Sequence, residues 1–169
     1  MLRVDLGQLD REGSVAVEAS IPAEDGLWDG AGLLWDGDVV VKLQATFAGT
    51  GEVVARGTVE GRLRQECRRC LNAVDTPYAQ ALTLVFVSDG SEEDGDGGAY
   101  GFDADQAELD LGEAVREEVV LAVNPYVVCD PECKGLCSRC GADLNEGPCH
   151  CSENEFDPRW EALRRLKSE

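Results

Sequence analysis

The chain of 169 residues has a single histidine, and its glycine-rich segments lack the patterns that bind phosphates. Because His150, the only imidazole, lies inside a cysteine cluster, no Ser-His-Asp or Cys-His pair is available for nucleophilic catalysis. There is neither a GxxxxGK[ST] loop nor a strand-bound GxGxxG. Carboxylates are abundant, but without a nucleophile, a base and an orienting group they do not make an active site. We therefore expect a protein that is not an enzyme and takes no small-molecule substrate.

Long apolar runs are also missing, and the unbroken ones are short, for example residues 119–123. Residues 1–25 show no basic segment followed by an apolar stretch, so we expect neither a signal peptide nor a membrane span. The expected location is the cytoplasm. Thiols stay reduced there, and cysteine pairs at C-x2-C spacing more often bind metal than form disulfides.

Basic residues are few, with 15 Lys and Arg against 34 Asp and Glu, which gives an acidic protein of formal net charge −19. A field of this sign repels a phosphate backbone and attracts basic partners, so non-specific nucleic-acid binding by the whole surface is not expected. The charge is uneven. Residues 88–118 hold twelve acids and one base, whereas residues 56–70 and 159–167 each have an excess of three bases. The plainest interpretation of any one of these patches is a solvated face.

Alternating apolar residues predict strands over residues 14–21, 38–47, 52–66 and 78–87. In the second of these the odd positions, up to Phe47, are expected to face the core. The fourth segment is apolar on both faces, which is typical of a central strand.

Three other N-terminal and central segments have weaker signals. Residues 2–6 alternate and predict an edge strand or a docked arm. Residues 23–37 are rich in Gly and Asp, which predicts an irregular connection pinned by burial of Trp28 and Trp35. The acidic, glycine-rich segment 88–101 has almost nothing to bury and predicts a mobile loop.

Two helices are predicted. The first begins with a D-x-x-E capping pattern at Asp110, buries valines from Val115 to Val123 and ends near Pro125. The second begins at Asp157-Pro158 and packs through Trp160, Leu163 and Leu166. The expected fold class is α+β: a mostly antiparallel sheet of five or six strands with one packed helix, a zinc-knuckle tail and a C-terminal helix. We divide it into a core, residues 1–128, and a zinc-binding tail, residues 129–169.

The eight cysteines predict two zinc ions, because structural zinc is held by four ligands in a tetrahedron. Cys67 and Cys70 form a C-x2-C pair at the expected hairpin tip, and six further cysteines lie between residues 129 and 151. The predicted first site contains Cys67, Cys70, Cys129 and Cys133, and the predicted second site contains Cys137, Cys140, Cys149 and Cys151. His150 is an alternative ligand, disfavoured because adjacent residues rarely both point at one ion. A site closed by four thiolates has no open position for a reactive water.

Five segments together resemble the YceD family of large ribosomal RNA subunit accumulation proteins. They are CRRCL at 67–71, LDLGEAVREEVVLAVNP at 109–125, KGLCSRCGADLN at 134–145, CHC at 149–151 and DPRWEALRRL at 157–166. The resemblance is weak before residue 50. It implies a bacterial or plastid-type cytosolic factor for the accumulation or processing of large-subunit ribosomal RNA, and it brings no catalytic residues. Some family members lack the cysteines matching 137–151, which implies that the second site is an accessory structural site.

Two functional hypotheses follow. The first is a non-enzymatic ribosome biogenesis factor whose partner is the pre-ribosomal large subunit. Its acidic body would engage basic ribosomal proteins, or the arginines around the first C-x2-C pair would contact rRNA phosphates. These arginines are Arg62, Arg64, Arg68 and Arg69. The alternative is a thiol-disulfide redox protein or switch that uses Cys67 and Cys70, because flanking arginines lower a thiolate pKa. A zinc store is a third interpretation, and the oligomeric state stays open.

Overall fold

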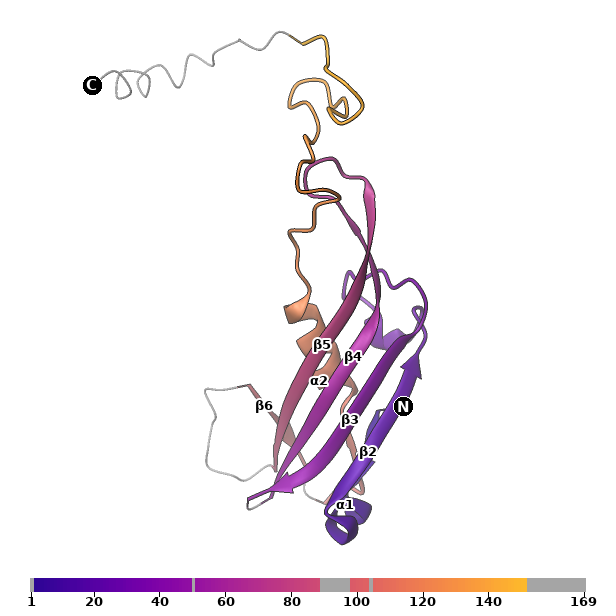
Figure 1. The fold of residues 1–169 in the computed structure, drawn as a ribbon. Coiled ribbons are helices and arrows are strands. Elements are labelled where there is room, and N and C mark those ends of the chain that lie inside the picture. Colours follow the sequence, from indigo (N-terminus) through magenta and orange to yellow (C-terminus); the bar gives the residue numbers. More distant parts are fainter. Residues whose placement is uncertain (1, 50, 89–97, 104, 152–169) are drawn as a thin grey trace, which may run out of the picture.

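The computed structural model describes residues 2–49, 51–88, 98–103 and 105–151. Five strands form the main sheet in the order β2-β3-β4-β5-β6 (Figure 1). Their bounds are Ser14–Ile21 for β2, Val39–Ala48 for β3, Glu52–Glu66 for β4, Ala73–Ser88 for β5 and Ala99–Phe102 for β6. The first four strands pair antiparallel, and β6 pairs parallel with the end of β5. The predicted α+β class with a mostly antiparallel sheet is confirmed.

A second, two-stranded sheet joins β1 (Arg3–Asp5) to β7 (Glu108–Asp110). The short strand predicted from residues 2–6 corresponds to β1. Helix α1 (Leu6–Glu12), between β1 and β2, was not predicted. Asp5 caps this helix by accepting from the backbone N–H of Gln8, and Gly13 ends it in the left-handed conformation. Both capping residues can be read from the sequence, but the prediction for this segment relied on the apolar alternation of residues 2–6 and did not use them.

Helix α2 (Gly112–Ala122) packs beside β5 and buries Val115 and Val119 in the main core. Its N-cap is Leu111, one residue later than the predicted Asp110. The carboxylate of Asp110 accepts a hydrogen bond from the N–H of Gly112 at 2.8 Å. The helix ends before Pro125, as predicted, and Val120 is exposed. The predicted C-terminal helix and residues 89–97 of the predicted mobile loop lie outside the described residues. The end of that predicted loop is wrong, because residues 99–101 belong to strand β6 and pair with β5.

Two details of strand burial differ from the prediction. Phe47 is 40% exposed, because it lies beside the β3–β4 turn at the end of the sheet. Strand β5 is not central along its length: Ala79 and Ala81 are exposed, and β6 pairs only with residues 85–88. Small alanines give a strand an apolar sequence on both faces without requiring burial on both.

Strands β4 and β5 extend past the rest of the sheet as a two-stranded arm (Figure 1). The pairing of β3 with β4 stops at Glu60, whereas the pairing of β4 with β5 continues to Glu66 and Ala73. Trp35 is buried against the base of this arm, where a Cβ at Gly61 would lie only 3.0 Å from its ring. The predicted pinning of residues 23–37 by tryptophan burial is confirmed, since Trp28 is buried too and its ring centroid lies 5.2 Å from that of Trp35.

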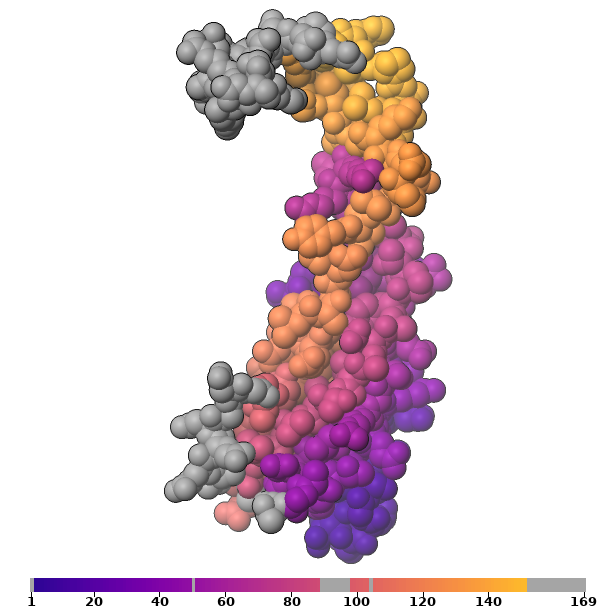
Figure 2. Space-filling view, turned by 60° about the vertical axis from the view of Figure 1, so that its left-hand side comes forward, coloured from indigo at the N-terminus to yellow at the C-terminus, as the bar shows by residue number. Residues whose placement is uncertain are grey.

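After α2 the chain returns to the tip of the arm. Gln65 donates to the carbonyl of Asn124, and the N–H of Arg68 donates to the carbonyl of Val127. In the space-filling view the orange residues of the tail lie against the magenta tip of the arm (Figure 2). The fold thus brings the first C-x2-C pair and the six later cysteines to one end of the molecule.

Candidate metal centres

The first group of thiols joins the arm to the tail. Cys67 and Cys70 lie on the turn between β4 and β5, and Cys129 and Cys133 lie on the segment that follows α2. All four sulfur atoms lie within 4.8 Å of one another, with 3.9 Å from Cys67 to Cys133 and 3.6 Å from Cys70 to Cys129. Sulfurs at the corners of a tetrahedron with Zn–S bonds of about 2.3 Å would be about 3.8 Å apart. The donor set and its spacing therefore fit a zinc ion.

The turn that carries Cys67 and Cys70 has a defined hydrogen-bond pattern. The carbonyl of Cys67 accepts from the N–H of Leu71, and the N–H of Cys67 donates to the carbonyl of Asn72, both at 2.8 Å. The N–H of Arg69 points at the Cys67 sulfur, 3.4 Å away. Leu71 lies in the left-handed region, with φ 62°. These bonds aim both thiols to the same side of the turn.

The second group consists of Cys137, Cys140, Cys149 and Cys151, whose sulfurs also lie within 4.8 Å of one another. Its first pair lies on a turn of the same construction. The carbonyl of Cys137 accepts from Gly141 at 2.9 Å, and the N–H of Cys137 donates to the carbonyl of Ala142 at 2.8 Å. We call residues 67–72 and 137–142 the first and second knuckles. Unlike the first group, the second is built from one continuous segment.

Backbone N–H groups favour one ionised sulfur in the first group. The N–H of Cys70, aided by those of Cys129 and Arg69, lowers the pKa of the Cys67 thiol to about 6 despite its burial. The neighbouring sulfurs, chiefly that of Cys133, raise the pKa of Cys129 to about 12. Four sulfurs this close cannot all ionise on their own, and a divalent cation would supply the missing charge.

The second group has the same electrostatics. The N–H groups of Cys140 and Arg139 lower the pKa of Cys137 to about 6, and the side chain of Cys140 is the main cause that raises the pKa of Cys151 to about 12. Each group therefore combines one thiol whose pKa the backbone lowers with at least one whose pKa the neighbouring sulfurs raise, and a bound cation would favour the ionised form of the second kind.

Arg69 fastens the first knuckle to the tail. Its Nη1 donates to the carbonyls of Pro131 at 3.0 Å and Cys133 at 2.8 Å. Its own carbonyl accepts from the N–H of Leu136 at 3.0 Å. Gly135 makes this approach possible, because a Cβ there would lie 2.8 Å from the Arg69 carbonyl oxygen. Arg69 is thus a structural clamp beside the first group of thiols.

Asn145, in the loop between Cys140 and Cys149, reaches from the second group to the first. Its Nδ2 lies 3.4 Å from the Cys133 sulfur, and its Oδ1 accepts from the N–H of Lys134 at 2.8 Å. Spacing alone could not identify this contact, although Asn145 ends the KGLCSRCGADLN segment on which the family resemblance depends.

The other three arginines considered for phosphate contact also have partners in the chain. Arg64 pairs with Asp75 at 2.8 Å, and this contact raises the pKa of Arg64 and lowers that of Asp75. Arg62 lies 4.0 Å from Asp36. The guanidinium of Arg68 lies over the ring of Tyr126, 4.2 Å from its centroid. Each of the four arginines thus has a partner in the chain, although the partners of Arg68 and Arg69 are uncharged and leave their positive charge uncompensated.

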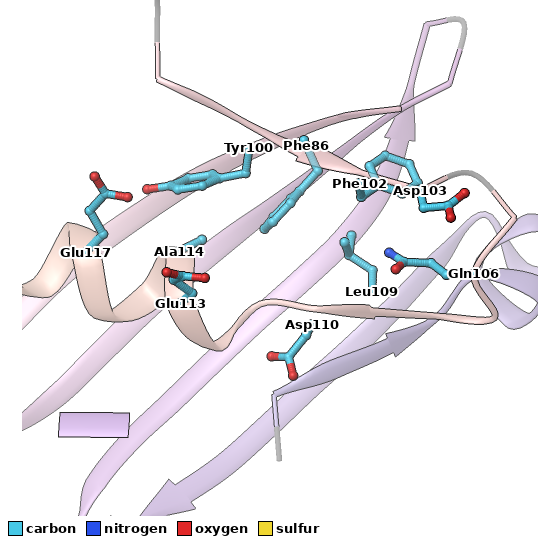
Figure 3. Close-up of a pocket in the computed structure, with 11 residues that line it drawn as sticks. Phe86, Tyr100, Phe102, Asp103, Gln106, Leu109, Asp110, Glu113, Ala114 and Glu117 are labelled. Atoms are coloured by element: carbon cyan, nitrogen blue, oxygen red, sulfur yellow. The ribbon is translucent and has the colours of Figure 1, made fainter. Parts of the chain in front are cut away.

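An acid-lined hollow of about 450 Å³ lies at the other end of the sheet, between β6 and α2 (Figure 3). The rings of Phe86, Tyr100 and Phe102 line it, together with four carboxylates, those of Asp103, Asp110, Glu113 and Glu117. Asp110 pairs with Arg3 at 3.4 Å. Within the described residues the other three carboxylates have no ion-pair partner, so the hollow keeps net negative charge.

The thiols lie in the same two groups that the spacing predicted, whereas His150 is exposed and belongs to neither group. The contacts of Arg69 and Asn145 were not predicted. Among the described residues, no helix has the length and apolar character needed to cross a membrane.

A family model described as large ribosomal RNA subunit accumulation protein YceD matches residues 55–167. An uncharacterized protein of Mycobacterium tuberculosis is 34% identical over 113 residues, covering 66% of this chain and 54% of that protein. A Zea mays protein named large ribosomal RNA subunit accumulation protein YCED homolog 1, chloroplastic, is 27% identical, covering 88% of this chain and 60% of its own length. The chain thus spans little more than half the length of these relatives. No solved structure matches significantly.

Proposed function

The chain belongs to the YceD family, and we propose that it is a non-enzymatic, cytoplasmic ribosome biogenesis factor that supports accumulation or processing of large-subunit ribosomal RNA. We propose further that both thiol groups hold structural zinc. The observation that carries the proposal is the first group, whose four sulfurs have tetrahedral spacing and come from segments about 60 residues apart. Zinc closed by four thiolates has no site for substrate, so its role would be to hold the arm and tail as one platform.

The charge distribution favours a basic ribosomal protein of the pre-ribosomal large subunit as the direct partner over rRNA phosphates. The four arginines between residues 62 and 69 already contact Asp36, Asp75, Tyr126 and backbone carbonyls. The hollow beside α2, in contrast, keeps three carboxylates without cationic partners among the described residues. With a net charge of −19, the surface attracts a basic chain at long range and repels a polyanion.

Burial argues against the redox alternative. Cys67 is fully buried and Cys70 nearly so. Exchange with a partner disulfide needs an accessible attacking sulfur, however low its pKa. The lowered pKa of Cys67, which backbone N–H groups cause, suits a metal ligand as well as a redox thiolate.

Two measurements on the full chain test the proposal. Elemental analysis should find about two zinc ions per chain with all thiols protected. Affinity capture at moderate salt should recover large-subunit precursors, with a basic ribosomal protein cross-linked to the chain. Metal-free folded protein with a freely reducible Cys67–Cys70 disulfide would favour the redox alternative. Capture of neither precursors nor ribosomal proteins would count against a role in ribosome assembly.

A further inference from the structure

We propose that Asn145 is a positioning residue through which the second thiol group slows metal loss from the first. This inference rests on the proposed zinc content of both groups. It assigns the second group a role beyond folding its own segment, because Asn145 belongs to the loop of one site and contacts a ligand of the other.

Both polar atoms of the Asn145 side-chain amide, Nδ2 and Oδ1, make hydrogen bonds. Its Nδ2 donates to the Cys133 sulfur at 3.4 Å and to Oδ1 of Asp143 at 2.7 Å, and its Oδ1 accepts from the backbone N–H of Lys134 at 2.8 Å. An N–H donor directed at a metal-bound thiolate offsets part of its negative charge and orients the sulfur. Four thiolates on one divalent ion leave two uncompensated charges, so the first site needs such donors.

Besides these contacts, a metal on the second group would constrain the position of Asn145. It lies between Cys140 and Cys149, in the loop that a metal on the second group would close at both ends. The backbone N–H of Asn145 donates to Asp143, whose other carboxylate oxygen accepts from Asn72 of the first knuckle at 3.2 Å. The loop therefore docks on the first knuckle through a continuous set of hydrogen bonds.

Metal on the second group would keep this loop closed and so hold the amide against Cys133. Without that metal the loop would gain conformational freedom, and the donor would leave the sulfur for part of the time. By linkage, metal on the first group must raise the metal affinity of the second group by the same factor by which the second raises that of the first. The two sites would then lose metal in a coupled manner.

The test is the rate of zinc transfer from the full chain to an excess of a colorimetric chelator. Asn145→Ala should release one of its two zinc ions about 10- to 100-fold faster than the wild type. Asn145→Asp keeps the acceptor for Lys134 but loses the donor and adds negative charge, so it should release zinc at least as fast. Glu146→Gln, an exposed neighbour, is the matched control and should behave as the wild type. Circular dichroism would verify that each variant is folded.

A double-mutant cycle tests whether the second group acts on the first site through Asn145. Removing the second site with Cys137→Ser and Cys140→Ser should also speed release of the remaining zinc ion. Adding Asn145→Ala to that background should then change little, because the amide has already left Cys133. Equal release from Asn145→Ala and wild type, or effects that simply multiply, would overturn this inference and leave the proposed function intact. A wild-type chain without zinc would instead overturn the proposed zinc content, and this inference with it.

Discussion

Leu71 and Gly141 occupy equivalent positions in the two knuckles, each directly after the second cysteine of a C-x2-C pair, with φ angles of 62° and 72°. Each N–H donates to the carbonyl of the first cysteine of its pair. Glycine adopts this left-handed conformation freely, whereas leucine pays about 1–2 kcal/mol. The leucine is also 58% exposed, so burial does not compensate for this strain.

Exchanging these two residue types should change stability in opposite directions. Leu71→Gly relieves backbone strain but adds freedom to the unfolded chain, which leaves a gain of about 0.5–1 kcal/mol. Gly141→Leu should cost about 0.5–1 kcal/mol, because a Cβ there meets no atom within 4 Å and the backbone strain is partly offset by the reduced freedom of the unfolded chain. Chemical unfolding of the zinc-loaded variants measures both changes. Destabilisation by Leu71→Gly would mean that the leucine side chain makes contacts that stabilise the fold.

Removing one ligand from each group should separate their structural roles. Cys67→Ser and Cys137→Ser should each lower the zinc content to about one ion per chain. Cys67→Ser should destabilise the chain more, by about 1.5 kcal/mol, because the first group closes a much longer loop. Elemental analysis and thermal unfolding are the measurements. If Cys137→Ser lowered the stability more than Cys67→Ser, the second group would contribute more to folding than the first.

Arg69→Ala should weaken the junction between arm and tail. The guanidinium donates to two carbonyls, so its loss should cost about 1–3 kcal/mol in the free energy of unfolding. Arg62→Ala is the control, because its exposed contact with Asp36 at 4.0 Å should contribute less than about 0.5 kcal/mol. Urea unfolding of both variants gives the comparison. Equal effects would show that Arg69 does not act as a clamp.

The hydroxyl of Tyr100 should lose its proton at a higher pH than an ordinary tyrosine does. Burial first, and then the charges of Glu117 and Glu118, raise the pKa of its hydroxyl from 10.0 to about 12. Because the folded protein holds this proton more tightly than the unfolded chain does, the associated stability is complete below pH 10 and disappears between about pH 10 and 12. Glu117→Gln should lower this pKa part of the way, since burial remains. Tyrosinate absorbance measures the titration, and Tyr100→Phe identifies its step. An unchanged pKa of Tyr100 in Glu117→Gln would show that this carboxylate does not raise it.

Short-range patterns in the sequence determined much of the fold. Alternation predicted β2 and β4 with their bounds and β3 to within one residue, because one face of each must be apolar. Strand β5 begins at Ala73, five residues before the predicted start, because its pairing with β4 continues to the end of the arm. Alternation also placed the first C-x2-C pair at a hairpin tip. Ligand spacing indicated two groups of four thiols because a tetrahedral ion needs four donors. The family resemblance, too, depended on residues readable in order along the chain.

Tertiary structure alone decided which polar groups meet. Arg69 contacts carbonyls more than 60 residues away, and Asn145 reaches Cys133 only because its loop folds back along residues 134–136. Neither contact leaves a periodic signal, since a single side chain makes each of them, with two backbone carbonyls for Arg69 and one sulfur for Asn145. Exposure of Phe47 likewise depended on where the sheet ends. Periodicity reports which face of an element is apolar, whereas docking between distant segments determines what that face and its polar neighbours touch.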